Sequence, residues 1–321
     1  MKSTQQGVAL ITAMLIVAII AALATSLALG QQVWLRQTQN LVDLAQAEQL
    51  RQGAYEYAAA VLVRDERSSL TNKSDNLQEA WAQPIPPLPV EGGVVAISIN
   101  DAQARFNLNN LVQQGQPVND EIEIFRRLLA QLGLSADLVN PLIDWLDADS
   151  NTLPGGAEDL DYLNLDPPYR AANRPLRSVD ELRLVKGYTA EIVNELSKHV
   201  VALPESAQRK PINVNTASAE VLAALAGTDI EQAKKTIQVR DNKPFENPGE
   251  FKALYGNSQL LHPNTYNVKS EFFIVTVETR IGRIQRRTEA LMDRSFGNAA
   301  KADVVWYRQP PISFTLDEDK S

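Results

Sequence analysis

The sequence predicts an α+β protein in which a long N-terminal helix packs on an antiparallel sheet, with a large all-α domain inserted between the strands. Three observations lead to this prediction. An uncharged apolar run near the N-terminus continues as an amphipathic helical pattern. Alternating strand patterns stand at residues 94–99 and again between residues 272 and 308. Roughly 150 residues of mostly helical pattern separate the two strand regions.

The composition allows about two domains and narrows the classes of function. The chain has 321 residues, a net charge of −8 and no cysteine. The missing cysteines exclude a disulfide framework and a thiolate metal site. The acidic balance argues against a nucleic acid partner. The chain has only two histidines, and its sequence contains no glycine-rich phosphate loop and no serine nucleophile elbow. Because few residues of catalytic type are present, we expect that the protein is not an enzyme.

Residues 8–30 predict a transmembrane helix. No charge occurs from residue 3 to residue 35. As a helix, Val8 to Gly30 would span about 35 Å, enough to cross a hydrocarbon core about 30 Å thick. Apolar residues then recur every three or four positions, which predicts an amphipathic helix continuing to about Asp65. A secretory signal and an ordinary anchor stay open as alternatives, although this run is longer than a usual signal core.

The rest of the chain divides into a loop, strands, an inserted helical region and a tail. Residues 66–93 are polar and then proline-rich, which is typical of a loop. We assign residues 31–105 to the amphipathic helix, this loop and the first strand, residues 106–265 to the insert, and residues 266–309 to the remaining strands. The expected strands and turns are Val94–Ile99, Phe272–Thr279, a turn at Gly282, Arg283–Met292 and Asp303–Arg308. The tail, residues 310–321, is predicted to be disordered.

The insert contains an internal repeat, in residues 106–182 and 212–251. Phe106-Asn-Leu-Asn-Asn110 matches Ile212-Asn-Val-Asn-Thr216, 106 residues further on. The segment 174–182 matches segment 243–251, only 69 residues further on. In these second motifs Ser178 or Asn247 stands three residues before a glutamate, which predicts a capping box that opens a helix. The first copy therefore carries about 37 extra residues between its two motifs.

The second copy resembles the helix-hairpin-helix modules of DNA-uptake receptors. In those modules a turn with two glycines presents backbone N–H groups to DNA phosphates. Here the turn is Ala226-Gly-Thr-Asp229, and a carboxylate at the second glycine position would repel a phosphate. We therefore expect a structural platform and no nucleic acid partner. A membrane-anchored DNA-binding protein of a DNA-uptake system is the alternative function.

The extra residues of the first copy predict a calcium-binding acidic loop, residues 144–170. Asp147, Asp149, Asn151 and Glu158 occupy positions 1, 3, 5 and 12 of a twelve-residue frame, the spacing with which an EF-hand loop wraps Ca²⁺. The glycine expected at position 6 is replaced, so the turn is expected at Pro154-Gly-Gly156. A solvated acidic loop is the open alternative. The candidate ligands of this structural Ca²⁺ are Asp144, Asp147, Asp149, Asn151, Glu158, Asp159 and Asp161.

The N-terminus resembles the leader of type IV pilin-like proteins. The resemblance rests on Gln6-Gly7 followed by Val8-Ala-Leu-Ile-Thr12. It implies that residues 1–7 form a leader, and that a prepilin peptidase cuts after Gly7 and methylates Val8. Most members carry a glutamate at the position of Thr12, which is thought to pair with the terminal amine of the subunit ahead. A subunit without this glutamate suits a filament tip.

Leader, split sheet and acidic loop together resemble the minor pseudopilin K subunits of the bacterial type II secretion system. The most specific stretch is residues 144–187. The resemblance implies a pilin-like fold and a Ca²⁺-binding insert. It also implies a single span in the inner membrane with the bulk of the chain in the periplasm. Such a subunit joins minor pseudopilins I and J in a tip complex that promotes pseudopilus assembly for protein export across the outer membrane. The other pseudopilins are further expected partners.

Overall fold

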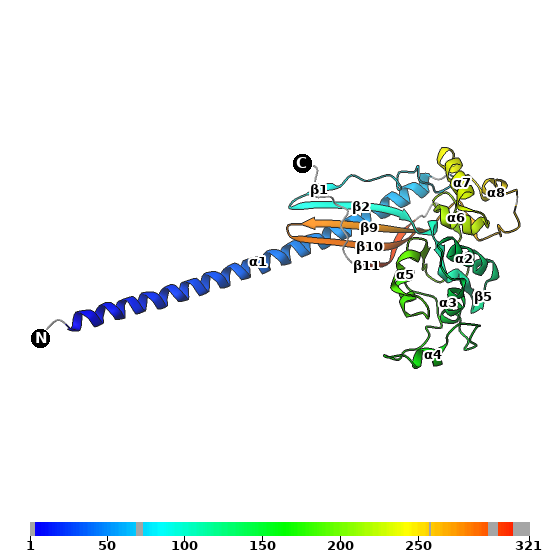
Figure 1. Cartoon of the computed structure of the whole chain (residues 1–321). Coiled ribbons are helices and arrows are strands. Elements are labelled where there is room, and N and C mark those ends of the chain that lie inside the picture. The colour runs from blue at the N-terminus through cyan, green and yellow to red at the C-terminus, as the bar shows by residue number, and fades with distance from the viewer. Residues whose placement is uncertain (1–3, 69–72, 257, 295–300, 311–321) are drawn as a thin grey trace.

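The long helix α1 (Thr4–Ser68) projects from the rest of the molecule (Figure 1). The computed structural model describes residues 4–68, 73–256, 258–294 and 301–310. The 65 residues of α1 span about 100 Å. Within the described residues, one helix, Ala9–Arg67, is long and apolar enough to cross a membrane; its most apolar window has a mean hydropathy of 2.6 and no buried residue. The amphipathic helix thus runs three residues beyond the predicted end at Asp65.

A five-stranded antiparallel sheet lies against the second half of α1. Its strand order is β1-β2-β9-β10-β11, and every neighbouring pair is antiparallel. The strands are β1 (Leu88–Val90), β2 (Gly93–Asp101), β9 (Phe272–Ile281), β10 (Ile284–Arg294) and β11 (Ala302–Arg308). All four predicted strands are confirmed. The prediction of an uninterrupted loop over residues 66–93 is wrong at β1, where Leu88 pairs with Val95 to make a short edge strand. The expected disordered tail, from residue 311 on, lies outside the described residues.

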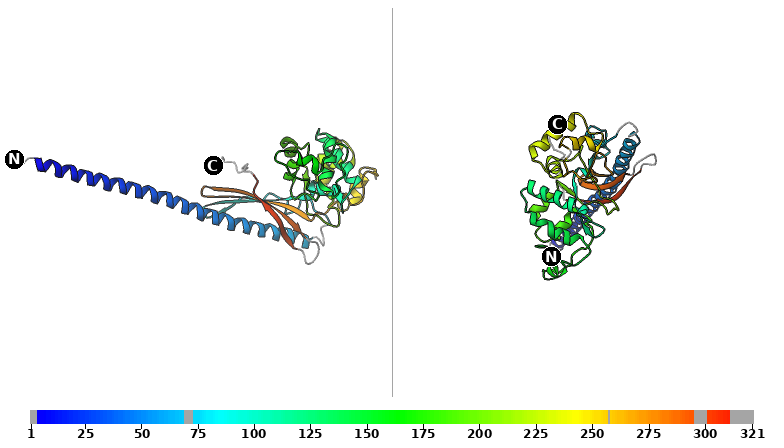
Figure 2. Two further views of the ribbon diagram at one scale, coloured as in Figure 1. Left: turned by 90° about the horizontal axis from the view of Figure 1, so that it is seen from below. Right: turned by 90° about the vertical axis from the view of Figure 1, so that its right-hand side faces the viewer.

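Small side chains let α1 pack closely on one face of the sheet. Ala54, Ala58 and Leu62 are buried against Ile97 and Val275. The left-hand view of Figure 2 shows α1 running along the sheet, with the remaining helices gathered beyond one end of it. Apolar residues at the helical period therefore find a surface of alternating strand residues, which buries both patterns at once.

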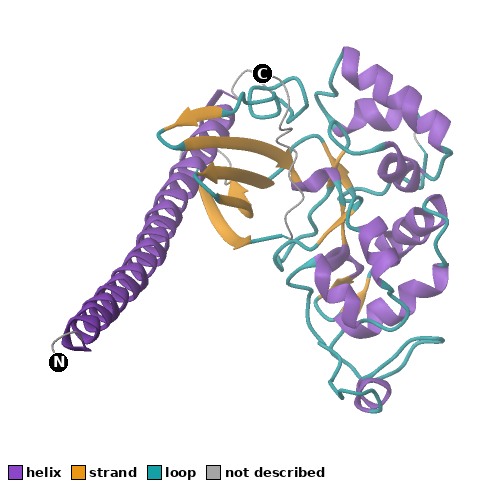
Figure 3. Cartoon of the chain, turned by 60° about the vertical axis from the view of Figure 1, so that its left-hand side comes forward, coloured by secondary structure: helices purple, strands orange, loops and turns teal. Residues whose placement is uncertain are grey.

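The helical insert leaves the sheet after β2 and returns to it at β9. Its helices are α2 (Asn119–Gln131), α3 (Val139–Leu146), α4 (Asp159–Leu163), α5 (Ala190–Leu196), α6 (Ala219–Ala226), α7 (Ile230–Asn242) and α8 (Pro248–Ala253). Its two-residue strands are β3 (Phe106–Asn107), β4 (Val112–Gln113), β5 (Gln116–Pro117), β6 (Val200–Val201), β7 (Ile212–Asn213) and β8 (Tyr266–Asn267). The 3₁₀ turns are Ala102–Ala104, Leu108–Leu111, Ala136–Leu138 and Val179–Leu184. Figure 3 shows the helices in two groups beside the sheet.

The two repeat copies make the same backbone clamp. Nδ2 of Asn109 donates to the Leu176 carbonyl (2.9 Å), and the Leu176 N–H donates back to Oδ1 (2.8 Å). Asn215 clamps Phe245 in the same way, with both distances 2.9 Å. Asn109 and Asn215 are equivalent at the first offset, Leu176 and Phe245 at the second. The repeated residues thus mark a shared structural feature, in which one side-chain amide satisfies two buried backbone groups. Nδ2 of Asn109 also donates to the Leu203 carbonyl at 2.8 Å.

Of the two predicted capping boxes, the one at Asn247 is confirmed and the one at Ser178 is not. Asn247 caps α8 by accepting the Glu250 N–H at 3.2 Å. Ser178 makes no side-chain cap, so the prediction is wrong there: the segment after it forms a 3₁₀ turn, in which the Ser178 carbonyl already takes the Glu181 N–H. In both copies the glutamate accepts the N–H of the residue before the cap, from Arg177 at 2.8 Å and from Glu246 at 3.0 Å.

Candidate metal centre

The acidic loop connects the end of α3 to the start of α4. Asp147 is the C-cap of α3, and Glu158 is the N-cap of α4. Between them the predicted turn is confirmed: the Gly156 N–H donates to the Leu153 carbonyl at 2.8 Å, and Gly155 has φ +78°. A proline followed by a glycine with positive φ is a type II turn. The chain therefore reverses direction without the position-6 glycine of an EF-hand loop.

Asp144 ties this turn to α3. Its side chain is fully buried, and burial raises the pKa of its carboxyl. The Leu153 N–H donates to both of its oxygens at 3.2 Å, and the Ala157 N–H donates to Oδ2 at 2.9 Å. A Cβ at Gly156 would lie 1.9 Å from Oδ2, so a side chain there would displace the carboxylate. Asp144 thus acts on the loop backbone.

Three other carboxylates converge beside it. One oxygen from each of Asp147, Asp149 and Glu158 lies within 4.8 Å of the other two. Asp147 and Glu158 are each only 4% exposed. Among the described residues, Oδ1 of Asp147 and both carboxylate oxygens of Glu158 have no hydrogen-bond partner. Burying anionic oxygens without a donor or a cation is strongly unfavourable.

The pKa values of these carboxyl groups also indicate negative charges without a compensating positive charge. Burial, together with the charges of Asp149 and Asp144, raises the pKa of Asp147 to about 6. Burial and the neighbouring carboxylates, Asp144 first among them, raise the pKa of Glu158 to about 7. A cation would remove both the desolvation cost and the mutual repulsion. All the candidate ligand atoms are oxygens. This set fits Ca²⁺ and does not fit metal ions that prefer thiolate or imidazole ligands.

The other three predicted ligands have different surroundings. The Asn151 N–H donates to Asp149 Oδ1 at 2.7 Å, which shapes the loop. Asp159 accepts Nη1 of Arg170 at 2.9 Å and the Ala171 N–H at 3.0 Å. Asp161 accepts the Glu158 N–H at 3.1 Å, and its other oxygen lies 3.7 Å from Nζ of Lys186. Asn151, Asp159 and Asp161 therefore support the loop, and a ligand role for them stays a prediction.

Aromatic side chains cover the acidic loop, a role that the sequence reasoning missed. Trp145 contacts Tyr162 edge-on, with ring centroids 5.2 Å apart, and Tyr162 stacks on Tyr169 at 5.3 Å. Burial raises the pKa of Tyr162 to about 12. Trp145 and Tyr162 are buried, and apolar surroundings of this kind strengthen charge interactions. The sequence feature that could have predicted this aromatic cover is the pair of tyrosines within an otherwise polar loop.

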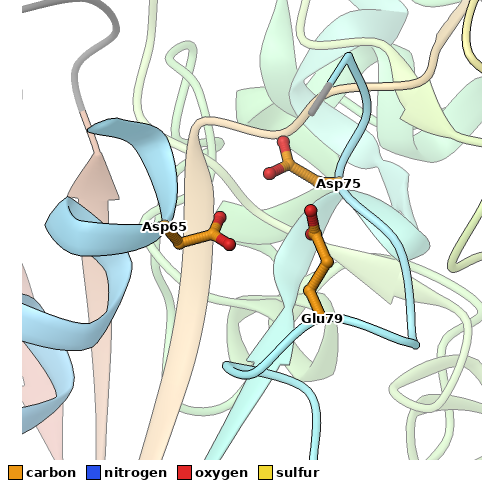
Figure 4. Close-up of side chains that lie close together, drawn as sticks. All are labelled: Asp65, Asp75 and Glu79. Atoms are coloured by element: carbon orange, nitrogen blue, oxygen red, sulfur yellow. The ribbon is translucent and has the colours of Figure 1, made fainter. Parts of the chain in front are cut away.

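A second group of carboxylates, also missed, lies where α1 ends. Figure 4 shows Asp65, Asp75 and Glu79 pointing toward one another. This group already holds a cation, because the buried guanidinium of Arg294 donates to Asp65 at 2.8 Å and to Asp75 at 2.7 Å. Burial raises the pKa of Asp65 to about 6 and that of Glu79 to about 7. We interpret it as a buried ion-pair cluster.

The turn that resembles a DNA-binding hairpin is already occupied by protein contacts. Gly227 ends α6 in the left-handed conformation, and Asp229 caps α7 by accepting the Gln232 N–H at 2.7 Å. From α2, Arg127 donates to the Ala224 carbonyl at 2.6 Å and Gln131 to the Thr228 carbonyl at 3.1 Å. At the start of α7 the Gln232 N–H, which could bind a phosphate, is thus already taken by Asp229, whose negative charge also opposes an anion, and α2 packs against the turn.

Comparisons with known proteins agree with this architecture. Two family models described as type II secretion system protein K match residues 104–205 and 212–267. Type II secretion system protein K of Pseudomonas aeruginosa is 40% identical over 292 residues, covering 88% of this chain and 86% of that protein. The protein of the same name from Klebsiella pneumoniae is 33% identical over 316 residues, covering 92% of this chain and 96% of that protein.

A solved structure matches the fold. It is a chain of the GspK–GspI–GspJ complex from the type 2 secretion system of enterotoxigenic Escherichia coli. The TM-score is 0.74 at 25% identity, and the match covers 86% of this chain and all of that one. The long helix, the sheet and the helical insert are therefore a shared fold, and the relatives support a minor pseudopilin role. On the identity and coverage of these relatives, this chain belongs to the type II secretion system protein K family.

Proposed function

We propose that this chain caps the tip of a pseudopilus together with two partner minor pseudopilins, I and J, and that it promotes pseudopilus assembly for protein export across the outer membrane. The observation that carries the proposal is the fold match to a chain solved in a complex of three such subunits. The bulky insert beyond one end of the sheet would hinder a further subunit from stacking above it. Thr12 at the usual glutamate position agrees with a subunit that has no neighbour ahead.

The proposal includes a membrane-stored precursor. The segment Val8 to Gly30 anchors the subunit in the inner membrane as a single span, with the bulk of the chain in the periplasm. A prepilin peptidase cuts after Gly7 and methylates Val8. Large apolar side chains from Leu10 to Leu35 are exposed on α1, which supports burial in lipid first and against the helices of other pseudopilins later.

Calcium is part of the proposed mechanism as a structural ion. Asp147, Asp149 and Glu158 would hold it, and the ion would supply the positive charge that these buried oxygens lack. Asp144 keeps the turn in place by binding the backbone of Leu153 and Ala157. Fixing Asp147 at the end of α3 to Glu158 at the start of α4 gives the insert a single shape for contact with its partners.

Thermal unfolding of the full chain in detergent, after chelator treatment, tests the ion. We expect Ca²⁺ to raise the melting temperature and Mg²⁺ to do so much less, because a ligand that binds only the folded state stabilises it. The shift should vanish in Asp147→Asn/Glu158→Gln. It should persist in the matched control Glu231→Gln/Asp241→Asn, which removes two exposed charges on α7. A Ca²⁺ shift that is unchanged in the first variant would refute this site.

Co-purification with partner subunits tests the tip assignment. The full chain is expressed with minor pseudopilins I and J and is isolated through a tag on one partner. We expect a three-subunit complex, recovered in lower yield for Asp147→Asn/Glu158→Gln and in unchanged yield for the control. Recovery of the partners without this chain would contradict the tip assignment, whatever the result with calcium.

A further inference from the structure

A groove of about 1000 Å³ lies between α1 and the turns of two hairpins. The two turns lie together, because the Gly282 N–H donates to the Gly92 carbonyl at 3.0 Å. Gly282 also lies against α1: a Cβ there would be 2.5 Å from Oδ2 of Asp43. The hairpin turns at this end of the sheet, toward the free part of α1 in Figure 1, are thus fixed beside residue 43 of the helix.

The groove opens close to the expected membrane surface. The uncharged run from Val8 to Leu35 has 28 residues. As a helix it spans about 42 Å, close to the thickness of a bilayer with its headgroups. Trp34, 63% exposed near the end of this run, fits the aromatic belt of a membrane interface. Asp43 lies about 12 Å beyond Leu35 along α1, a little more than one Debye length, and Arg36 lies directly at the end of the run.

Arginine side chains without partners gather at the hairpin end of the sheet, beside this groove. The guanidinium groups of Arg36 on α1 and of Arg280, Arg283 and Arg286 on the β9–β10 hairpin make no hydrogen bond or salt bridge with the described residues. In the strand register Arg286 is on the face that packs against α1, and Arg280 is on the opposite face of the sheet. Arg36 and Arg283 line the groove itself. In a chain with a net charge of −8, four unpaired arginines at the end nearest the span form a local positive surface.

The acids that face these arginines do not cancel them. Asp43 is buried and accepts Nε2 of Gln39 at 2.8 Å, and Glu91 is the exposed acid of the groove. Glu48, which faces Arg286, is already paired with Arg51. On the same hairpin, Glu278 and Glu289 are paired with Arg287. The groove lining itself balances Arg36 and Arg283 against Asp43 and Glu91. Counted over the whole hairpin end of the sheet, four unpaired arginines stand against these two acids, so this end of the sheet is positive.

We propose that this groove and its arginines bind anionic phospholipid headgroups of the periplasmic leaflet. The guanidinium group forms paired hydrogen bonds with phosphate oxygens, and it loses less hydration than an ammonium on doing so. The amide side chains of Asn40 and Gln49 also line the groove and can bond the glycerol of a headgroup. The contact holds the hairpin end of the sheet on the bilayer and so sets the tilt of the stored subunit. This inference rests on the membrane placement in the proposed function.

A single-cysteine variant of the full chain tests the proposal. The chain has no cysteine, and Gln285 is exposed beside the hairpin turn, so Gln285→Cys gives one labelling position. A donor dye at this position reports its distance to acceptor dyes on lipid headgroups in nanodiscs. We expect higher energy transfer when phosphatidylglycerol is mixed into phosphatidylcholine, and loss of the difference in high salt. Each arginine removed from the hairpin should lower the contact equilibrium about fivefold.

The decisive variant is Arg280→Gln/Arg283→Gln/Arg286→Gln. Its matched control, Arg177→Gln/Lys235→Gln/Lys243→Gln, removes the same charge from exposed positions of the insert. The inference is overturned if phosphatidylglycerol does not change the transfer in the unsubstituted hairpin, or if the control loses the effect equally. A chain that enters neither kind of nanodisc overturns the membrane placement as well. A chain that enters both without lipid dependence overturns only the headgroup contact. Equal melting temperatures of the two triple variants verify that both are folded.

Discussion

Nη2 of Arg294 lies 2.7 Å from both carboxylate oxygens of Asp75, and both side chains are buried. The same guanidinium donates to Asp65 at 2.8 Å and to the Ser270 carbonyl at 2.8 Å. Arg294 ends β10, Asp65 stands in the last turn of α1, and Ser270 precedes β9. One side chain therefore joins three segments that lie far apart in the sequence.

Arg294→Ala should destabilise the protein strongly. The substitution leaves Asp65 and Asp75 buried without their cation, which costs about 3–5 kcal/mol. The loss should shrink below about pH 6, where Asp65 and Glu79 are protonated. Urea unfolding of the full chain in detergent measures it. Arg126→Ala is the control, because its ion pair with Glu123 is exposed and contributes at most about 1 kcal/mol. Equal losses in the two variants would contradict a buried ion-pair cluster.

Both asparagine clamps of the repeat should contribute to stability. Asn215→Ala leaves one N–H and one carbonyl buried without a partner, which costs about 2–4 kcal/mol. Asn109→Ala leaves one N–H and two carbonyls, those of Leu176 and Leu203, so its loss should be at least as large. Asn242→Ala on the exposed side of α7 should change stability by no more than about 0.5 kcal/mol. Chemical unfolding of the three variants makes the comparison. A neutral result at either clamp would mean that water replaces the amide there.

A glycine-to-alanine substitution should have opposite effects on stability at Gly156 and at Gly53. Gly156→Ala should lower stability by about 2 kcal/mol or more, because its Cβ would displace the Asp144 carboxylate. It should also weaken calcium binding. Gly53→Ala meets nothing within 4 Å in the interior of α1, so it should raise helix stability by up to about 1 kcal/mol. Melting temperatures with and without Ca²⁺ test both. A harmless Gly156→Ala would show that the turn can move away from Asp144.

The stability of the metal-free protein should fall as pH rises. The pKa values of Asp147 and Glu158 are raised in the folded state, to about 6 and about 7. Between the ordinary carboxyl range, near pH 4, and pH 7 the folded state holds more protons than the unfolded chain, so its stability decreases with pH. With Ca²⁺ the slope should reverse, because the ion binds the deprotonated carboxylates.

Other carboxyls with raised pKa values, Asp101 among them, add to this slope, so a difference measurement is required. Thermal unfolding across this pH range, in chelator and in Ca²⁺, is compared between the parent chain and Asp147→Asn/Glu158→Gln. The parent minus variant difference should show the two opposite slopes. Identical pH profiles for the two proteins would mean that Asp147 and Glu158 do not titrate in this range.

The sequence by itself determined the elements that local pattern encodes. An uncharged run followed by a 3.6-residue period predicts one long helix, whose second half can be buried on one face. Alternation in β2, β9, β10 and β11 suits a half-buried sheet. The spacing of Asp147, Asp149 and Glu158 was also visible, because these side chains lie close together in the sequence. The repeated asparagines were visible only as a repeat, because each clamps a residue 30 or 67 positions away. β1 was missed, because three residues including a proline carry too little pattern.

Only the tertiary structure determined which charged side chains come into contact in the interior of the protein. Arg294 meets Asp65 and Asp75 across 229 and 219 residues, and no local pattern marks that meeting. Asp144, Asp159 and Asp161 look alike in the sequence, yet they bind backbone N–H groups or cations, while Asp147 and Glu158 are left with bare oxygens. The physical reason is desolvation: the cost of a charge depends on what the folded chain brings around it, and that environment is set by contacts distant in sequence.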